Sequence, residues 1–169
     1  LLEKHGIAYP ENTNFFDNLL NSKIKHEIDN LKVVKLERQE TIARQRADYN
    51  ETLCKELKII FLNLKITEAL ENKFNTKFKL ESLDIWYDYK GYALDPHRDD
   101  DRIKLALQIY LGDDNAGTSL FENNKSPAFH TFKYKCNNGY ALLNNDFSFH
   151  GTEYSVVNNV RKSMYVRYS

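Results

Sequence analysis

The sequence predicts a mainly β domain of the α+β class, in which N-terminal helices support antiparallel strands. Apolar residues recur at helical spacing in the first half of the chain, whereas after about residue 80 aromatic and β-branched residues alternate with polar ones. Turn-forming clusters such as "GDDNAG" and "KCNNG" separate these alternating stretches. The chain has 169 residues, the size of one domain. We therefore expect a single domain, 1–169, with a mainly helical support region, 1–80, and a β core, 81–169.

Two helices are expected in the first half. Residues 11–30 and residues 51–63 each place apolar side chains about one turn apart, which is typical of a helix with one buried face. These side chains are Phe15, Leu19, Leu20 and Ile24 in the first segment and Leu53, Leu57, Ile60 and Phe61 in the second. The stretch "LKVVKL" between them is compatible with an edge strand. Residues 38–46, "RQETIARQR", are most simply a solvated face, although Arg46 can also shape the mouth of a pocket.

Two stretches of the second half alternate as strands do. They are "IKLALQIYL", residues 103–111, and "RKSMYVRYS", residues 161–169. Each has one apolar face and one mixed face, because successive side chains of a strand point to opposite sides. The mixed faces carry Lys104, Ala106, Gln108 and Tyr110 in the first stretch and Arg161, Ser163, Tyr165 and Arg167 in the second. We expect the apolar face to pack under the helices and the mixed face to line the inside of whatever the sheet encloses.

Composition narrows the possible partners. Lysine plus arginine equals aspartate plus glutamate at 24 each, so no overall field attracts the protein to nucleic acid or to an anionic membrane. The most apolar run, "IIFLNL", is too short to cross a bilayer, and the first residues lack the pattern of a signal peptide. The two cysteines, Cys54 and Cys136, have no CxxC partner, which suits a reducing compartment. We therefore expect a cytoplasmic location and no membrane partner.

The stretch "LDPHRDD", residues 94–100, places His97 and Asp99 two residues apart. Both can reach one ion, because residues i and i+2 of an extended chain project from the same face. A mononuclear Fe(II) oxygenase needs two imidazoles and one carboxylate on one face of an octahedron, with the other positions open. We expect the second imidazole from His150, which lies in "DFSFHGTE" after an apolar run and before a glycine turn. His130, in "SPAFHTFKY", is the second candidate.

Each part of this pattern also has a structural interpretation. A His-x-Asp pair alone is frequent by chance, and a solvated acidic loop can explain Asp95, Asp99, Asp100 and Asp101. On its own, His150 is typical of a turn or core histidine. The metal prediction therefore depends on the three residues occurring together.

With these residues, the second half of the chain resembles the Fe(II)- and 2-oxoglutarate-dependent dioxygenases. Their signature is His-x-Asp, a distant His, and an Arg or Lys on the final strand, matched here by His97, Asp99, His150 and Arg161. The resemblance implies a double-stranded β-helix, a cupin-like jelly roll with N-terminal helices on its larger sheet. It implies Fe(II) as the metal, 2-oxoglutarate as cosubstrate and O2 as oxidant, with ascorbate as a candidate stimulant. It also implies that Arg161 grips the far carboxylate of 2-oxoglutarate, with a hydrogen bond added by Ser163.

Within that superfamily the sequence looks most similar to the prolyl-4-hydroxylase-like branch. Tyr87, ten residues before His97, and Tyr110 in "IYL" occupy places where that branch has tyrosines. The resemblance implies that both line the pocket and contact 2-oxoglutarate, although either can be plain core packing. "NAGTSLFE", with Gly117, looks like the glycine-rich turn of the branch. The sequence departs from the pattern at Leu94, where the branch has a second tyrosine, and at "GT", where it often has two glycines.

The function that the resemblance implies is hydroxylation of a small molecule or a prolyl-type peptide side chain, with release of succinate and CO2, by residues 81–169 as the catalytic core. One alternative is an oxidative nucleic-acid demethylase, whose superfamily members share the five-residue gap between Arg161 and Arg167. The balanced charge and the lack of an obvious base-stacking lid oppose it, so nucleic acid is not an expected partner. Another alternative is a cupin-like non-catalytic metal-binding module, which would not explain the basic residue Arg161 on the last strand. We expect Arg167 to form a structural salt bridge. The sequence does not indicate the oligomeric state.

Overall fold

The computed structural model describes residues 7–8, 32–34, 44–48, 51–63, 66–152 and 160–169. The helices are α2, Glu51–Asn63, and α3, Ile66–Phe74. The strands of the first half are β1, Ile7–Ala8; β2, Lys32–Val34; and β3, Arg44–Asp48. Those of the second half are β4, Leu80–Asp88; β5, Leu94–His97; β6, Leu105–Tyr110; β7, Ser119–Phe121; β8, Ala128–Thr131; β9, Gly139–Leu143; β10, His150–Thr152; and β11, Arg161–Tyr168. No helix in these ranges is long and apolar enough to cross a membrane.

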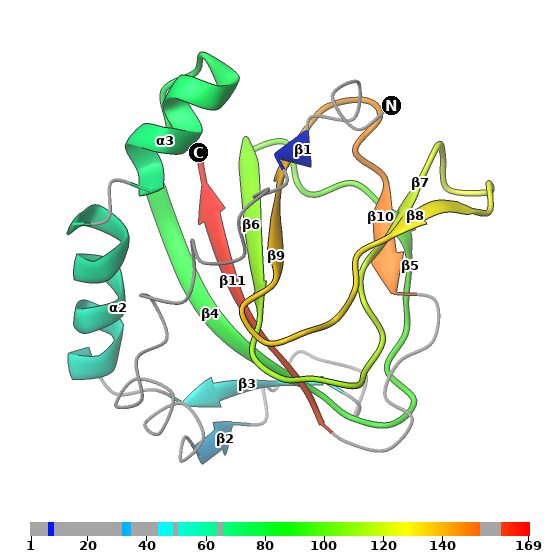
Figure 1. Ribbon diagram of the computed structural model, residues 1–169, viewed down its shortest axis with the longest axis horizontal. Helices are drawn as coiled ribbons and strands as arrows, with labels where there is room; N and C mark the ends of the chain where they lie inside the picture. The colour runs from blue at the N-terminus through cyan, green and yellow to red at the C-terminus, as the bar shows by residue number, and fades with distance from the viewer. Residues whose placement is uncertain (1–6, 9–31, 35–43, 49–50, 64–65, 153–159) are drawn as a thin grey trace.

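The strands form two antiparallel sheets (Figure 1). The large sheet has the order β1-β9-β6-β11-β4-β3-β2, and the small sheet has the order β5-β10-β7-β8. Most neighbours in these sheets are distant in the sequence, so long connections pass between the sheets as they do in a jelly roll. Strand β11, the last of the chain, lies in the middle of the large sheet between β6 and β4. The side chains of its inner face therefore reach the centre of the molecule.

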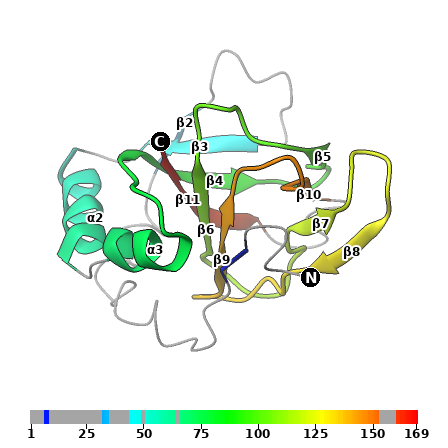
Figure 2. The ribbon, with the colours of Figure 1, turned by 90° about the horizontal axis from the view of Figure 1, so that it is seen from above.

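Helices α2 and α3 lie on one side of the large sheet, and the small sheet lies on the other (Figure 2). The helices contribute Leu57 and Phe61 from α2 and Ile66 and Leu70 from α3 to the main apolar core. The sheet contributes the aliphatic side chains of β4, β6 and β11, namely Leu83, Ile85, Leu105, Leu107, Ile109, Met164 and Val166. This core holds the large sheet flat against the helices and leaves its other face free to line a cavity.

The two alternating stretches fold as predicted. Leu107 of β6 and Met164 and Val166 of β11 are buried in the core under the helices. On the opposite faces, Gln108 of β6 and Arg161 of β11 point into the space between the sheets. The alternation was enough to separate these two faces, because one face of each strand packs against the helices and the other does not.

The first eighty residues contribute strands as well as helices. The helix expected over 51–63 is present as α2, and "LKVVKL" contains β2 at the edge of the large sheet, as predicted. The helix expected over 11–30 lies outside the described residues. Strand β3 was not predicted, because its pairing with β4 is accompanied by ion pairs of Arg44 and Arg46 rather than by apolar alternation.

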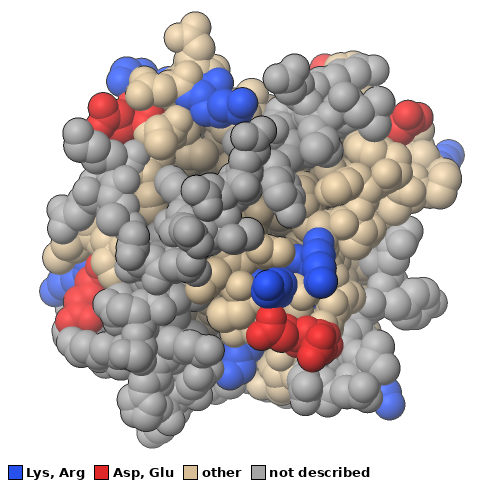
Figure 3. All heavy atoms as spheres, viewed as in Figure 1, with Lys and Arg blue, Asp and Glu red and all other residues tan. Residues whose placement is uncertain are grey.

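Charged side chains of both signs lie next to one another on the face drawn in Figure 3. Elsewhere among the described residues, surface ion pairs join Arg98 to Asp146 at 3.1 Å and Arg102 to Asp100 at 2.9 Å. On that face the described residues form no broad area of a single sign, which agrees with the net charge of zero for the whole chain.

Candidate metal and cosubstrate site

The small sheet brings the three predicted metal ligands together. His97 ends β5 and His150 begins β10, and the two are direct partners in the antiparallel register. Their ring centroids are 4.5 Å apart. Asp99 follows β5 by two residues, and one donor atom from each of the three residues lies within 4.8 Å of the others. His130, the second candidate, lies on β8 and is not part of this cluster.

Backbone carbonyls orient both imidazoles. Nδ1 of His97 is 2.9 Å from the carbonyl oxygen of Asp95, and Nδ1 of His150 is 3.0 Å from that of Ser148. A carbonyl oxygen only accepts hydrogen bonds, so each Nδ1 carries the hydrogen and each Nε2 keeps its lone pair. This is the tautomer that a metal ligand needs, held by the type of partner that surrounds metal-binding histidines.

The two carboxylate oxygens of Asp99 have different surroundings. Oδ2 accepts a hydrogen bond of 3.0 Å from the hydroxyl of Tyr165 on β11. Oδ1 lies 4.0 Å from Nε2 of His150 and faces the space between the ligands. Burial, and next the charge of Asp99, raise the pKa of Tyr165 well above its ordinary value, so this tyrosine remains a donor. Tyr165 thus holds one oxygen and leaves the other for an ion.

Burial lowers the pKa of His150, with a smaller contribution in the same direction from His97, and the negative charge of Asp99 opposes this shift. His150 is only 5% exposed. A lowered pKa keeps the imidazole neutral at pH 7, which is the form that binds metal.

Gly151 allows β5 and β10 to approach closely enough for this arrangement. A Cβ atom at Gly151 would lie 2.4 Å from the carbonyl oxygen of Leu94, well inside contact distance. The register also shifts between His150 and Thr152, which marks a local irregularity where the ligand strand begins. The glycine that the sequence places after His150 therefore lets the two ligand strands lie side by side.

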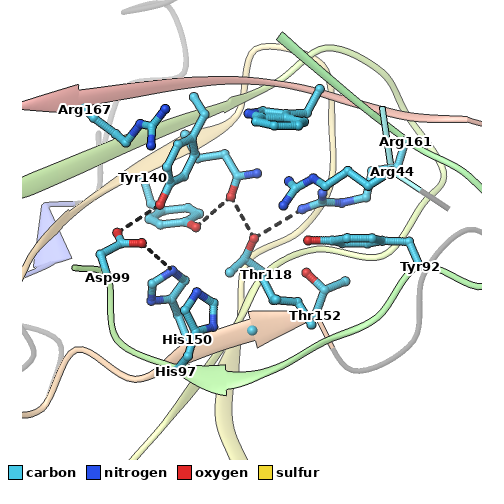
Figure 4. Close-up of a pocket in the computed structure, with 15 residues that line it drawn as sticks. Arg44, Tyr92, His97, Asp99, Thr118, Tyr140, His150, Thr152, Arg161 and Arg167 are labelled. Atoms are coloured by element: carbon cyan, nitrogen blue, oxygen red, sulfur yellow. Dashed lines mark hydrogen bonds and ion pairs between the residues drawn. The ribbon is translucent and has the colours of Figure 1, made fainter. Parts of the chain in front are cut away.

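A cavity of about 160 Å³ extends from His97, Asp99 and His150 into the space between the sheets. Figure 4 shows its two ends. His97, Asp99 and His150 gather at one end, and Arg161, Arg44 and Tyr92 lie at the other, with Thr118 between them. The cavity thus joins a set of candidate metal ligands to a pair of cationic side chains.

Arg161 begins β11 and is 1% exposed. Its Nε donates to the carbonyl oxygen of Ala116 at 2.8 Å, Nη1 donates to Oδ2 of Asp88 at 2.5 Å, and Nη2 donates to Oγ1 of Thr118 at 3.3 Å. Burial alone would lower the pKa of Arg161, but the neighbouring Asp88 and Tyr110 outweigh it and raise the pKa above its ordinary value. A guanidinium has five N–H groups, so two remain beyond these three contacts with described residues.

Asp88 is fully buried and shared by two arginines. Its Oδ1 lies 2.8 Å from Nε of Arg44, while its Oδ2 accepts from Arg161. The guanidinium of Arg44 also stacks over the rings of Trp86 and Tyr92, at 4.7 Å and 4.6 Å from their centroids. Two cations against one anion leave this end of the cavity with one excess positive charge. A ligand with a single carboxylate would neutralise it.

No protein-family model matches the sequence, and no curated protein matches it. Solved structures do match the fold. An oxidoreductase of the 2OG-Fe(II) oxygenase family from Burkholderia pseudomallei aligns with a TM-score of 0.71 at 14% identity, covering 99% of this chain and 86% of its own. HygX from Streptomyces hygroscopicus, with nickel and 2-oxoglutarate bound, aligns with a TM-score of 0.70 at 12% identity, covering 99% and 84%. A prolyl hydroxylase from Trichoplax adhaerens, in complex with a hypoxia inducible factor peptide, aligns with a TM-score of 0.65 at 13% identity, covering 99% and 84%.

The chain has the fold of the 2OG-Fe(II) oxygenases. The double-stranded β-helix expected from the sequence is thereby confirmed, and so is the resemblance on which it rested. The identities of 10% to 15% explain why comparison of whole sequences finds no match, although the short pattern of His97, Asp99, His150 and Arg161 indicates the likeness.

The structure brings the three accessory residues expected from the sequence to different places. Tyr110 is buried beside Arg161, with its ring centroid 5.5 Å from the guanidinium, and its hydroxyl accepts a hydrogen bond from the backbone N–H of Thr118. Ser163 is buried on the inner face of β11, and its Oγ has no hydrogen-bond partner among the described residues. Tyr87 lies in the apolar core under the helices, on the opposite face of β4 from Trp86, and does not line the cavity.

Several cavity residues were not predicted as site residues. Oε1 of Gln108 accepts hydrogen bonds from Thr118 Oγ1 at 2.9 Å and from the hydroxyl of Tyr140 at 2.6 Å, and Thr118 in turn contacts Arg161. The alternation of β6 had placed Gln108 on the inner face, so a signal for it existed. Tyr92 and Thr118 lie in loops, where no periodicity indicates direction.

The described residues fit the two groups that this fold implies. Two imidazole nitrogens and one carboxylate are the donor set of mononuclear Fe(II) oxygenases, which leaves three positions open. At the other end, Arg161 has two further N–H groups, and the buried hydroxyl of Tyr92 has no hydrogen-bond partner among the described residues. Burial raises the pKa of Tyr92 to about 12, so its hydroxyl is a donor at neutral pH. The N–H groups of Arg161 and the hydroxyl of Tyr92 are donors that suit a carboxylate.

Proposed function

We propose that the protein is an Fe(II)- and 2-oxoglutarate-dependent dioxygenase that hydroxylates a small molecule or a peptide side chain. The observation that carries this proposal is the cavity itself, which has His97, Asp99 and His150 at one end and the buried cation Arg161 at the other. The fold of the 2OG-Fe(II) oxygenases supports the same conclusion.

When bound, Fe(II) and 2-oxoglutarate supply the oxidising chemistry, in which O2 converts 2-oxoglutarate to succinate and CO2 and places one oxygen atom on the substrate. The chain's own residues bind and orient. His97, Asp99 and His150 fix a face of three donors, while Tyr165 holds the carboxylate of Asp99 in one orientation. Arg161 and Tyr92 bind the far carboxylate of the cosubstrate.

The buried walls of the cavity keep water away from the reacting atoms. Arg161, Thr118 and Tyr140 are each at most 3% exposed, so the cosubstrate end is largely shielded from bulk water. A dry site strengthens the interaction of Arg161 with an anion and protects reactive species from side reactions.

The substrate class is left open by the fold, because similar structures hold very different molecules. HygX has been solved with hygromycin B, and the Trichoplax prolyl hydroxylase with a peptide. An epimerase from nogalamycin biosynthesis also shares the fold, with a TM-score of 0.67. We therefore propose a small molecule or a peptide side chain as the substrate of this chain, whose cavity is lined by polar as well as aromatic side chains.

Oxidative demethylation of nucleic acid is less well supported. Arg167, which suggested it, pairs with Asp84 at 2.7 Å, as expected of a structural salt bridge. The described residues of the face in Figure 3 offer mixed charges rather than a basic track for a phosphate backbone.

Uncoupled turnover tests the proposed function. Protein loaded with Fe(II) and 2-oxoglutarate in air is expected to release succinate slowly without substrate. His150→Ala is expected to abolish this release, and Arg161→Ala is expected to require at least about tenfold more 2-oxoglutarate for it. Arg102→Ala, which alters an exposed arginine outside the cavity, is the matched control and should retain it. Metal binding without succinate release at any 2-oxoglutarate concentration would instead support the non-catalytic, cupin-like module.

A further inference from the structure

The inner face of the large sheet carries a second Arg–Asp–Arg cluster that the proposed function does not use. Oδ2 of Asp84 lies 2.7 Å from Nη2 of Arg167, and Oδ1 lies 3.5 Å from Nη1 of Arg46. Nε of Arg167 donates to the hydroxyl of Ser82 at 2.9 Å. This outer cluster, Arg46–Asp84–Arg167, repeats the chemistry of the deep cluster, Arg44–Asp88–Arg161.

The repetition follows from the strand register. β3 supplies Arg44 and Arg46, β4 supplies Asp84 and Asp88, and β11 supplies Arg161 and Arg167. Asp84 and Asp88 share a face of β4 because they are four residues apart, which corresponds to about 13 Å along a strand. The same three strands therefore place two cationic clusters at the two ends of one surface.

The two clusters differ in exposure. In the deep cluster the side chains of Arg161 and Asp88 are 1% and 0% exposed. In the outer cluster those of Arg167 and Arg46 are 37% and 46% exposed, although Asp84 between them is only 6% exposed. The outer arginines can therefore meet a molecule arriving from solvent, whereas the deep arginine meets only what the cavity encloses.

The outer cluster carries excess positive charge and has N–H donors beyond those used in its contacts with described residues. Asp84 neutralises one of its two guanidiniums, which leaves one excess positive charge. Arg167 uses Nε and Nη2 in its contacts with Ser82 and Asp84, so its Nη1 keeps two N–H groups beyond the contacts with these described residues. Arg167 also lines the cavity, and Figure 4 places it on the Asp99 side, away from Arg161.

We propose that Arg167 and Arg46 form an anion-binding subsite that selects a small substrate carrying a carboxylate or phosphate group. This inference rests on the proposed function. Arg167 is two residues from Tyr165, which holds the metal ligand Asp99, so the subsite begins about 7 Å along the strand from that contact. A substrate whose anionic group binds there would place a carbon atom, a few bonds away from that group, next to the metal.

A small anion fits this surface better than a polyanion. A shallow groove continues from Arg167 past Arg102, but it also carries Glu81 and Asp100, and Arg102 already pairs with Asp100. The acidic side chains would repel a chain of phosphates beyond the first one. The excess positive charge is thus confined to one point, which matches one anionic group.

The chain contains its own reporter for this subsite. Trp86 is the only tryptophan of the sequence, lines the cavity, and pairs with Arg46 across the strands. We would load the full chain with Ni(II), which prevents turnover, and saturating 2-oxoglutarate, which fills the deep cluster. Methyl phosphate and acetate would then be titrated separately at constant ionic strength while the emission of Trp86 is followed.

We expect at least one of the two anions to produce a saturable change in emission, and which one does so distinguishes phosphate from carboxylate. Arg167→Gln should weaken that binding about tenfold, the loss expected for one charge-assisted contact. Asp84→Asn should strengthen it, because the substitution raises the excess positive charge. Arg102→Gln, the matched control, should leave it unchanged, and circular dichroism with 2-oxoglutarate affinity checks that each variant is folded.

The outcomes separate the inference from the function on which it rests. Normal 2-oxoglutarate binding with anion affinity unchanged in Arg167→Gln would overturn the subsite alone. Failure of 2-oxoglutarate to bind would overturn the proposed function, and the anion titration repeated without 2-oxoglutarate still decides the subsite through the same variant. A single-stranded oligonucleotide that binds more tightly than methyl phosphate, with an affinity that Arg102→Gln also weakens, would replace the small substrate by a polynucleotide.

Discussion

At the residue scale, the site depends on single side chains that act on the predicted ligands. Asp99 is useful to a metal only if one of its oxygens is free and correctly aimed. The hydrogen bond from Tyr165 fulfils this condition by engaging Oδ2 and leaving Oδ1 near His150. The affinity of a metal site depends both on the ligands and on the hydrogen bonds that other residues make to those ligands.

Tyr165→Phe should therefore weaken Fe(II) or Ni(II) binding about tenfold without unfolding the protein. Tyr168→Phe is the matched control, because Tyr168 lies on the same strand but packs in the core under the helices. Isothermal titration under anaerobic conditions measures both variants. Equal metal affinities in the two would show that Tyr165 does not position Asp99.

Asp88 is the residue on which the deep cluster depends for stability. Removing its charge leaves Arg44 and Arg161 close together, and the side chain of Arg161 is only 1% exposed. Asp88→Asn should lower the free energy of unfolding by about 3 to 5 kcal/mol, the usual loss when one partner of a buried ion pair is removed. Urea unfolding measures it, with the exposed Asp100→Asn as a control that should show no measurable loss. A loss as small as that of the control would contradict the account of a buried, shared carboxylate.

Sequence reasoning indicated the three residues of the proposed metal site but not all of their neighbours. The spacing of His97 and Asp99 was readable because both sit near one extended segment, whereas the choice of His150 needed a distant strand. Tyr87 was expected to line the pocket by resemblance, yet the alternation of β4 puts it with Leu83 and Ile85 on the core face. Applying the period of the strand would have put Trp86 in the cavity instead.

At the element scale, the pairing of β5 with β10 brings together the two histidines of the proposed metal site. His97 and His150 are neighbours only because the two strands approach closely at Gly151. β3 is an equally important element, since it brings Arg44 and Arg46 to the inner face of the large sheet. The sequence pattern did not predict β3 because its signals are charges whose partners lie some forty residues away, and local periodicity carries no information about them.

Gly151→Ala should push β5 away from β10 and separate the two imidazoles. We expect metal affinity to fall by at least about tenfold, because ligands must sit within a fraction of an ångström of their positions. Gly139→Ala is the control, since a Cβ there would collide with the carbonyl of Gln108 at 2.3 Å, in the large sheet. It should lower the thermal midpoint but keep metal affinity in the folded protein. Unchanged metal affinity in Gly151→Ala would show that the close approach of β5 and β10 is not needed.

At the scale of the whole molecule, the cavity joins the two sheets. The proposed metal ligands His97 and His150 belong to the small sheet, and Arg161 belongs to the large one. A cosubstrate that touches both ends therefore links the sheets, and its binding energy adds to the stability of the fold.

Metal alone should raise the Tm, and 2-oxoglutarate should raise it further by stabilising the folded state by about 2.7 kcal/mol at one hundred times its Kd. In Arg161→Ala the same 2-oxoglutarate concentration should stabilise the folded state by only about 1.4 kcal/mol or less, because binding is at least about tenfold weaker. Glutarate, which lacks the oxo group, should give a smaller rise, because it reaches Arg161 but chelates the metal poorly. Differential scanning fluorimetry distinguishes these cases, and an undiminished rise in Arg161→Ala would place the far carboxylate elsewhere.

The most direct test of the central claim is an anaerobic titration that follows the visible spectrum. Protein with Fe(II) receives 2-oxoglutarate, and a weak charge-transfer band develops only if the oxo acid chelates the iron. We predict that the band appears in the native chain, is lost in His150→Ala, and requires at least about tenfold more 2-oxoglutarate in Arg161→Ala. A chain that binds iron but develops no band, or a band indifferent to Arg161, would contradict the assignment of the cavity as a site for Fe(II) and 2-oxoglutarate.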